Sequence, residues 1–115
     1  MPLKIALTGA TGFVGRSVVS ALIAKSHQVS ALVRDSERAN LPPEVRQVQG
    51  DLNNNAALDD VTKGADVVIH IAGVIGALRR EDYFFANEQG ARATVEAASR
   101  NGIKRFVQMK YARSA

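Results

Sequence analysis

Three glycines near the start of the chain have the spacing and the neighbours that suit phosphate binding. Gly9, Gly12 and Gly15 lie in the run Thr8-Gly9-Ala10-Thr11-Gly12-Phe13-Val14-Gly15. We expect Gly9 to allow a tight turn, Gly12 to leave room for a pyrophosphate beside the backbone, and Gly15 to let a helix pack close to a sheet. A helix that begins here adds free N–H groups and the positive end of its dipole. The spacing therefore predicts a site for an anionic ligand.

The elements around these glycines favour a dinucleotide over other phosphate ligands. The apolar segment Leu3–Leu7 is typical of a strand, Phe13–Lys25 has the apolar spacing of a helix, and a second strand starts about 20 residues further on. A merely tight turn between a strand and a helix is the structural alternative. A nucleoside-triphosphate loop is excluded, because Ala10 and Arg16 stand where that loop needs glycine and lysine.

Strand and helix patterns alternate along the chain, which predicts the fold class α/β. The five predicted strands are Leu3–Leu7, Val29–Val33, Val45–Gln49, Val67–Ile71 and Arg105–Met109. The predicted helices are Phe13–Lys25, Ala56–Thr62 and a last one from about Tyr83 to Arg100, with Val74–Asp82 irregular and Lys110–Ala115 a tail. Continuous apolar strands predict a parallel sheet covered on both faces. The expected fold is a doubly wound, Rossmann-type parallel sheet in the order 3-2-1-4-5.

The composition is that of one small globular domain. The chain has 115 residues, of which 46% are hydrophobic, and it contains no cysteine. Its net charge of +4 is spread without a dense basic stripe, so we expect no nucleic-acid binding. We find no signal peptide and no apolar run of membrane-spanning length, and we expect a cytoplasmic location. The only histidines, His27 and His70, have no acidic cluster at metal-ligand spacing, so no metal site is expected.

Several motifs in order resemble the extended and atypical short-chain dehydrogenase/reductases, the epimerase/dehydratase-like group. The glycine run resembles the nucleotide-binding signature of that family. The other matching motifs are Gly50-Asp51-Leu52, His70-Ile71-Ala72-Gly73, Asn87-Glu88-Gln89-Gly90-Ala91, Val95-Glu96-Ala97-Ala98 and Lys104-Arg105-Phe106-Val107. The subgroup that looks most similar comprises atypical reductases related to an accessory subunit of respiratory complex I and the NmrA-like redox sensors. The resemblance extends from Leu3 to about Met109.

The resemblance implies a set of dinucleotide-binding residues in this chain, and we assign no catalytic or metal-binding residue. It places an acidic turn at Asp51 near the adenine and the end of the fourth strand beside the cofactor. The implied cofactor-binding residues are Gly9, Ala10, Thr11, Gly12, Phe13, Val14, Gly15, Arg34, Asp51, Leu52, Ala72 and Gly73.

The end of the second strand favours NADP(H) over NAD(H). An acidic residue there binds the ribose 2′-hydroxyl of NAD, whereas an arginine accommodates the 2′-phosphate of NADP. Here the acidic position falls near Val33, which cannot accept a hydrogen bond, and Arg34 follows. A guanidinium suits phosphate through paired, charge-assisted hydrogen bonds. NAD(H) remains the alternative, because Asp35 is close enough in sequence to meet a ribose hydroxyl.

The catalytic Tyr-x-x-x-Lys pair that the resemblance leads us to expect is absent. Asn87 lies four residues after Tyr83, and Ala115 lies four residues after Tyr111. Family members also continue into a substrate-binding part, so we interpret residues 1–115 as a truncated NAD(P)-binding Rossmann domain without a substrate domain. It is either the cofactor domain of an epimerase- or reductase-like enzyme, a non-catalytic redox sensor or accessory subunit, or a remnant that binds nothing.

The last predicted strand also bears on partners. As the final strand of the sheet it would form an apolar edge, and such edges pair with other strands. The resemblance adds that the helix 83–100 buries a face in dimers of the family. We therefore expect a homo-oligomer that forms through the helix 83–100 or through the edge strand 105–109.

Overall fold

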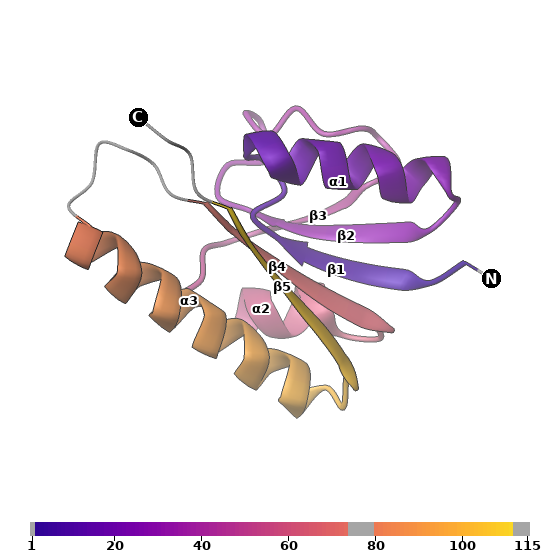
Figure 1. The fold of residues 1–115 in the computed structure, drawn as a ribbon. Helices are drawn as coiled ribbons and strands as arrows, with labels where there is room; N and C mark the ends of the chain where they lie inside the picture. Colours follow the sequence, from indigo (N-terminus) through magenta and orange to yellow (C-terminus); the bar gives the residue numbers. More distant parts are fainter. Residues whose placement is uncertain (1, 74–79, 112–115) are drawn as a thin grey trace.

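The structure is a computed structural model that describes residues 2–73 and 80–111, and a parallel sheet runs through it (Figure 1). The five strands are β1 (Lys4–Thr8), β2 (Gln28–Val33), β3 (Arg46–Gln49), β4 (Val67–Gly73) and β5 (Arg105–Tyr111). Every neighbouring pair is parallel, and the order is β3-β2-β1-β4-β5. The predicted doubly wound sheet and its strand order are confirmed.

Helices cover both faces of the sheet. Helix α1 (Phe13–Ala24) packs on one face, while α2 (Asn55–Thr62) and α3 (Arg80–Arg100) lie on the other, as Figure 1 shows. Along β1 the side chains alternate: Ile5 and Leu7 join the core under α1, and Ala6 joins the core under α2 and α3. Because both faces are buried, the strands need apolar residues at successive positions, which is the pattern that the sequence contains.

Most elements begin or end one to three residues from the predicted position, and two of these shifts extend an element into a segment that was predicted to be irregular or a tail. Strand β5 continues through Lys110 and Tyr111, which the sequence analysis placed in a tail, because β4 continues to Gly73 and these residues pair with its last two. Helix α3 begins at Arg80, so the predicted irregular stretch is wrong for residues 80–82. Residues 74–79, the rest of that stretch, lie outside the described residues.

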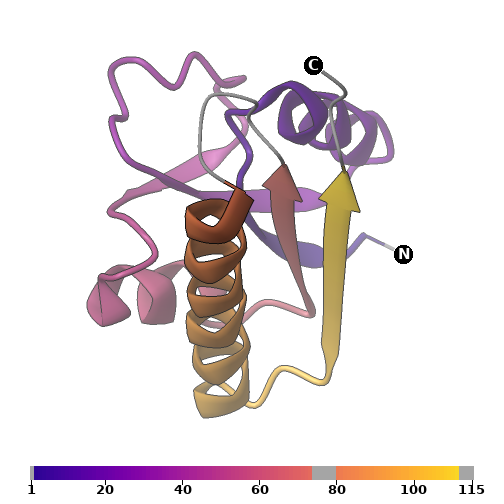
Figure 2. The same cartoon turned by 60° about the vertical axis from the view of Figure 1, so that its left-hand side comes forward.

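The carboxyl ends of all strands meet at one edge of the sheet. Figure 2 shows β4 and β5 pointing toward the end of the molecule where α1 and α3 begin. Strand β1 leads into α1 on one face, whereas β4 leads toward α3 on the other. The place between the carboxyl ends of β1 and β4 is thus the topological switch point, where sheets of this kind bind ligands. Within the described residues, no helix is both long and apolar enough to cross a membrane.

Candidate functional site

The turn from β1 into α1 is packed so tightly that two of its glycines are required by the fold. Gly9 has φ +80°, a conformation that favours glycine, and a methyl group there would overlap the carbonyl oxygen of Ile71 on β4. A methyl group on Gly15 would overlap the carbonyl oxygen of Gly9 and lie 2.8 Å from the Cα atom of Ala10. Gly15 therefore lets α1 approach the turn at the end of β1 closely.

Gly12 differs from these two glycines, because its backbone angles do not require glycine. It is the N-cap of α1, with φ −74° and ψ 174°, values that any residue adopts. It provides no side-chain cap, and the first turn of the helix contains no acidic residue. The N–H groups of the first turn and the helix dipole are thus left to attract an anion. A helix start without its own cap fits the pyrophosphate of a dinucleotide.

The remaining residues of this turn differ in exposure. Ala10 is fully buried and belongs to the core under α1. Thr11 is exposed, Val14 is half-buried, and the side chain of Phe13 is 84% exposed. Phe13 therefore contributes an apolar ring to the surface beside the helix start instead of filling the core.

At the end of β2, Arg34 is exposed and Asp35 is engaged within its own loop. Val33 is buried, and Arg34, the next residue, forms no ion pair with any residue that the structure describes. The Asp35 carboxylate accepts a hydrogen bond from the Glu37 N–H at 3.0 Å and lies 3.5 Å from Nε of Arg38. The Arg34 side chain is therefore exposed to solvent, whereas the Asp35 carboxylate already has partners within its own loop.

Arg16 joins the glycine turn to the loop that follows β2. Its Nε donates to the carbonyl oxygen of Thr11 at 3.1 Å. Its Nη1 and Nη2 donate to the carbonyl oxygens of Asn40 and Ala39 at 2.9 Å and 2.7 Å. Nothing in the sequence indicates this role, because two of the three acceptors are main-chain oxygens more than 20 residues away.

The turn after β3 holds the predicted Asp51 and Leu52. The Asp51 carboxylate accepts the Asn53 N–H at 2.8 Å, and the side chain is exposed. Leu52 is half-buried and packs against α3, where a methyl group on Gly90 would lie 2.6 Å from its Cδ1 atom. Close packing of α3 at Gly90 therefore fixes Leu52 near the carboxyl ends of the strands.

A buried polar pair connects the ends of β1 and β4. Thr8 and His70 are both 2% exposed, and Thr8 Oγ1 lies 2.5 Å from His70 Nδ1 in a hydrogen bond. The register places Thr8 directly opposite His70. Ala72 and Gly73, the other predicted site residues, form the end of β4 beside β5. The pair thus lies one residue before Gly9, under the switch point, and it is a structural contact that the sequence analysis did not predict.

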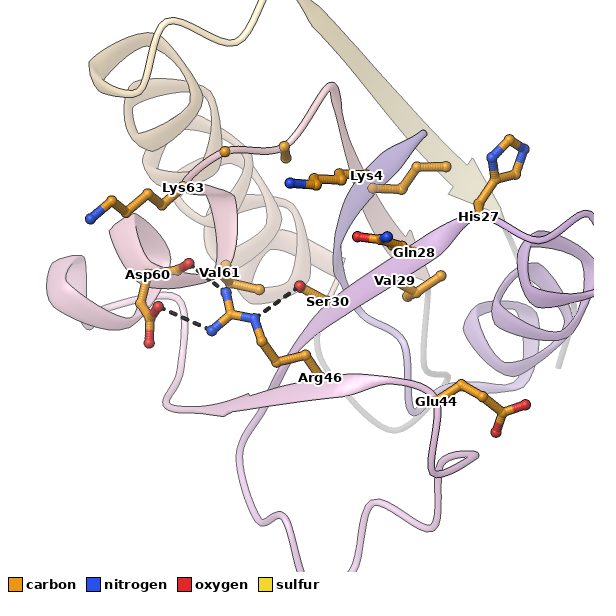
Figure 3. Close-up of a pocket in the computed structure, with 13 residues that line it drawn as sticks. Lys4, His27, Gln28, Val29, Ser30, Glu44, Arg46, Asp60, Val61 and Lys63 are labelled. Atoms are coloured by element: carbon orange, nitrogen blue, oxygen red, sulfur yellow. Dashed lines mark hydrogen bonds and ion pairs between the residues drawn. The ribbon is translucent and has the colours of Figure 1, made fainter. Parts of the chain in front are cut away.

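A hollow at the opposite edge of the sheet contains none of the predicted site residues. It has a volume of about 640 Å³ and is lined by the first residues of β1 and β2 and the end of α2. Figure 3 shows Arg46 in it, bonded to Asp60 and Ser30. His27, at its rim, accepts the Leu3 N–H through Nδ1 at 3.0 Å. In residues 2–73 and 80–111, no group of three or more acidic or histidine side chains could hold a metal ion.

Comparison with known proteins gives a consistent result. Residues 9–115 match the family model described as NAD(P)H-binding. A ceramide reductase of Caulobacter vibrioides is 44% identical over 105 residues, which cover 87% of this chain and 32% of that protein. The chain thus spans about a third of the length of this relative.

Solved structures of similar fold include one protein with bound NAD and one enzyme that is NADPH-dependent. A short-chain dehydrogenase/reductase superfamily protein from Agrobacterium tumefaciens, with bound NAD, has a TM-score of 0.72 and 32% identity, covering 91% of this chain and 31% of that one. An NADPH-dependent quinone oxidoreductase from Escherichia coli has a TM-score of 0.69 and 26% identity, covering 90% of this chain and 34% of that one.

Proposed function

The chain belongs to the NAD(P)H-binding family, and we propose that it forms the dinucleotide-binding part of a short-chain dehydrogenase/reductase that prefers NADP(H). The observation that carries this proposal is the start of α1. Gly12 caps the helix without a side chain, although its backbone angles would accept one. The backbone conformation therefore does not require glycine here, and the close approach of a ligand would account for it.

In this proposal the dinucleotide lies across the carboxyl edge of the sheet. Its pyrophosphate binds at the turn from Gly9 to Gly15, and its adenosine extends toward Arg34 and toward Asp51 and Leu52. Its nicotinamide lies toward Ala72 and Gly73, beyond the end of β1. The support is that all four segments leave the sheet at the same edge, on both sides of the switch point.

The NADP(H) preference rests on the end of β2. Arg34 is exposed and forms no ion pair with a described residue, so its guanidinium is available to a 2′-phosphate. Asp35, the residue that would favour NAD(H), bonds to Glu37 and faces Arg38. A carboxylate held by its own loop is a weaker partner for a ribose hydroxyl, because it would have to give up these contacts.

Hydride transfer to a substrate of the whole protein is a second part of the proposal. The nicotinamide supplies the hydride when the dinucleotide is bound. The described residues contribute binding and orientation, and neither tyrosine of the chain precedes a lysine at the catalytic spacing. A second candidate is a binding module without chemistry of its own, such as a redox sensor or an accessory subunit.

The test is a titration of the protein with NADPH and with NADH, followed by fluorescence or calorimetry. We expect NADPH to bind more tightly. Arg34→Ala should weaken NADPH binding by roughly 10- to 100-fold, because a hydrogen bond to a charged group contributes about 1.5–3 kcal/mol, and it should leave NADH binding nearly unchanged. Arg92→Ala is the matched control, since Arg92 is an exposed cation of α3 paired with Glu88.

Each outcome bears on a different part of the proposal. Equal NADPH affinity in wild type and Arg34→Ala would refute the cofactor preference. No binding of either dinucleotide by the wild type would refute the function itself. Turnover of NADPH by the isolated chain with a carbonyl substrate would refute the binding-only candidate.

A further inference from the structure

We propose that Arg16 is a positioning residue that sets the preference between the two dinucleotides. It does so by fixing the loop that carries Arg34 relative to the glycine turn. The inference rests on the proposed function, because it concerns how the same site distinguishes NADP(H) from NAD(H). Arg16 itself need not touch the cofactor.

The contacts of Arg16 connect two segments that would hold different parts of the ligand. One guanidinium nitrogen binds the carbonyl oxygen of Thr11, inside the glycine turn. The other two bind the carbonyl oxygens of Ala39 and Asn40, at the far end of the loop that begins with Arg34. A planar guanidinium offers these donors in one rigid fork, so the three acceptors are held at fixed positions relative to one another.

Among the described residues, no other hydrogen bond or ion pair joins this loop to α1. Its polar bonds are mainly internal, from Asp35 to Glu37 and to Arg38, with one from the Ser36 hydroxyl to the Gln49 side chain at 3.0 Å. Ala39 is 3% exposed and anchors the loop in the core. Asn40 has φ +50°, in the left-handed region. Few residues other than glycine adopt this conformation, and asparagine is one of those that adopt it more often. The bond from Arg16 to its carbonyl oxygen favours this conformation.

The consequence for recognition follows from what the two dinucleotides share. Both have a pyrophosphate, and only NADP(H) has a 2′-phosphate for Arg34 to meet. An untethered loop lets Arg34 sample more positions, and ordering it on binding then costs conformational entropy. The cost falls on the ligand that uses Arg34, so loss of Arg16 lowers the NADP(H) preference more than it lowers dinucleotide binding as such.

The experiment compares dissociation constants for NADPH and NADH in wild type, Arg16→Met, Arg34→Ala and the double variant. Methionine keeps much of the apolar stem of Arg16 and removes all three donors. We expect Arg16→Met to weaken NADPH binding about five- to tenfold, within the usual range of coupling between sites, and NADH binding by a smaller factor. In the Arg34→Ala background, Arg16→Met should have little further effect on the NADPH to NADH ratio, because it acts through Arg34.

Two further variants separate positioning from folding and from charge. Arg16→Lys keeps the charge but not the fork, so it should restore only part of the ratio. Lys25→Met removes a cation at the other end of α1 and should leave both affinities as in the wild type. Thermal unfolding of each variant reports the structural effect separately from the ratio.

An unchanged ratio in Arg16→Met, or a fully additive loss in the double variant, would overturn the assignment of Arg16. A wild type that binds both dinucleotides equally would overturn it as well, because there would be no preference to set. Absence of any dinucleotide binding in the wild type is the distinct result that refutes the proposed function, and this inference with it.

Discussion

At the level of single residues, the three glycines of the turn make different contributions. Methyl groups on Gly9 and Gly15 would overlap main-chain atoms, whereas the φ of −74° at Gly12 accommodates alanine. The fold therefore requires Gly9 and Gly15, and we propose that ligand binding requires Gly12. A substitution series can separate the two requirements within one turn.

We predict that Gly12→Ala weakens dinucleotide binding while the protein stays folded. Alanine for glycine at a helix N-cap costs about 1 kcal/mol or less, so the melting temperature should fall only slightly. Gly15→Ala should lower the melting temperature much more, because its methyl group meets the backbone of the turn, and overpacking costs about 1–3 kcal/mol. Thermal unfolding and NADPH titration of the same samples check both statements. A Gly12→Ala variant that binds like the wild type would contradict the role of Gly12.

The residues of the glycine turn were predictable from the sequence, but their partners were not. The spacing of glycines and the flanking strand and helix patterns are local signals. Arg16 and the pair of Thr8 and His70 depend on contacts across 23 to 62 residues, some of them to main-chain oxygens, which no spacing encodes. Two signals for the buried pair were nevertheless present, a threonine and a histidine at the ends of two apolar strands.

At the level of elements, α2 illustrates how the turn after β3 is fixed. The Asn54 side chain accepts the Ala57 N–H at 3.0 Å and caps the helix. Helix α2 starts at Asn55, directly after Asn54. The cap therefore also holds the end of the turn that carries Leu52.

We predict that Asn54→Ala destabilises the protein by about 1 kcal/mol, the usual cost of losing an N-cap bond. That loss corresponds to a fall of roughly 4 °C in melting temperature for a domain of this size. Asn53→Ala is the control, because Asn53 uses its backbone N–H, not its side chain, in the turn. Calorimetric melting curves of the two variants measure the difference, and equal curves would argue against the cap.

The order of strands was predictable from the sequence, whereas the ends of the elements were less so. Continuous apolar runs alternating with helical patterns leave few topologies for a parallel sheet, and the expected one is observed. The extension of β5 through Lys110 and Tyr111 depends on their pairing with Ala72 and Gly73 at the end of β4. The polarity of those residues favoured a tail, and the pairing with β4 outweighed that local preference.

At the level of the whole molecule, β5 forms one edge of the sheet. In the described residues it pairs with β4 alone, and Val107 on it is 43% exposed. The chain corresponds to about a third of the ceramide reductase that it resembles in sequence. An open edge with an exposed apolar side chain is a surface on which another strand can pair.

We predict that the 115-residue chain self-associates in a concentration-dependent way through this edge. Val107→Lys should shift the equilibrium toward monomer, because a charge on an edge strand opposes pairing. Sedimentation velocity over a range of concentrations measures the effect. The matched change Val95→Lys, at a 45% exposed position of α3, distinguishes the strand from the helix as the interface. A wild type that stays monomeric at all concentrations would contradict the prediction.

The contact between Gly9 and β4 also sets the order in which the site can be completed during synthesis. Gly9 is translated well before Ile71, whose carbonyl oxygen shapes its turn. The bond from Thr8 to His70 likewise spans 62 residues. A nascent chain that ends before β4 therefore contains every glycine of the turn but lacks the strand against which the turn packs. The turn therefore reaches its final packing only once the strand that it packs against has been translated.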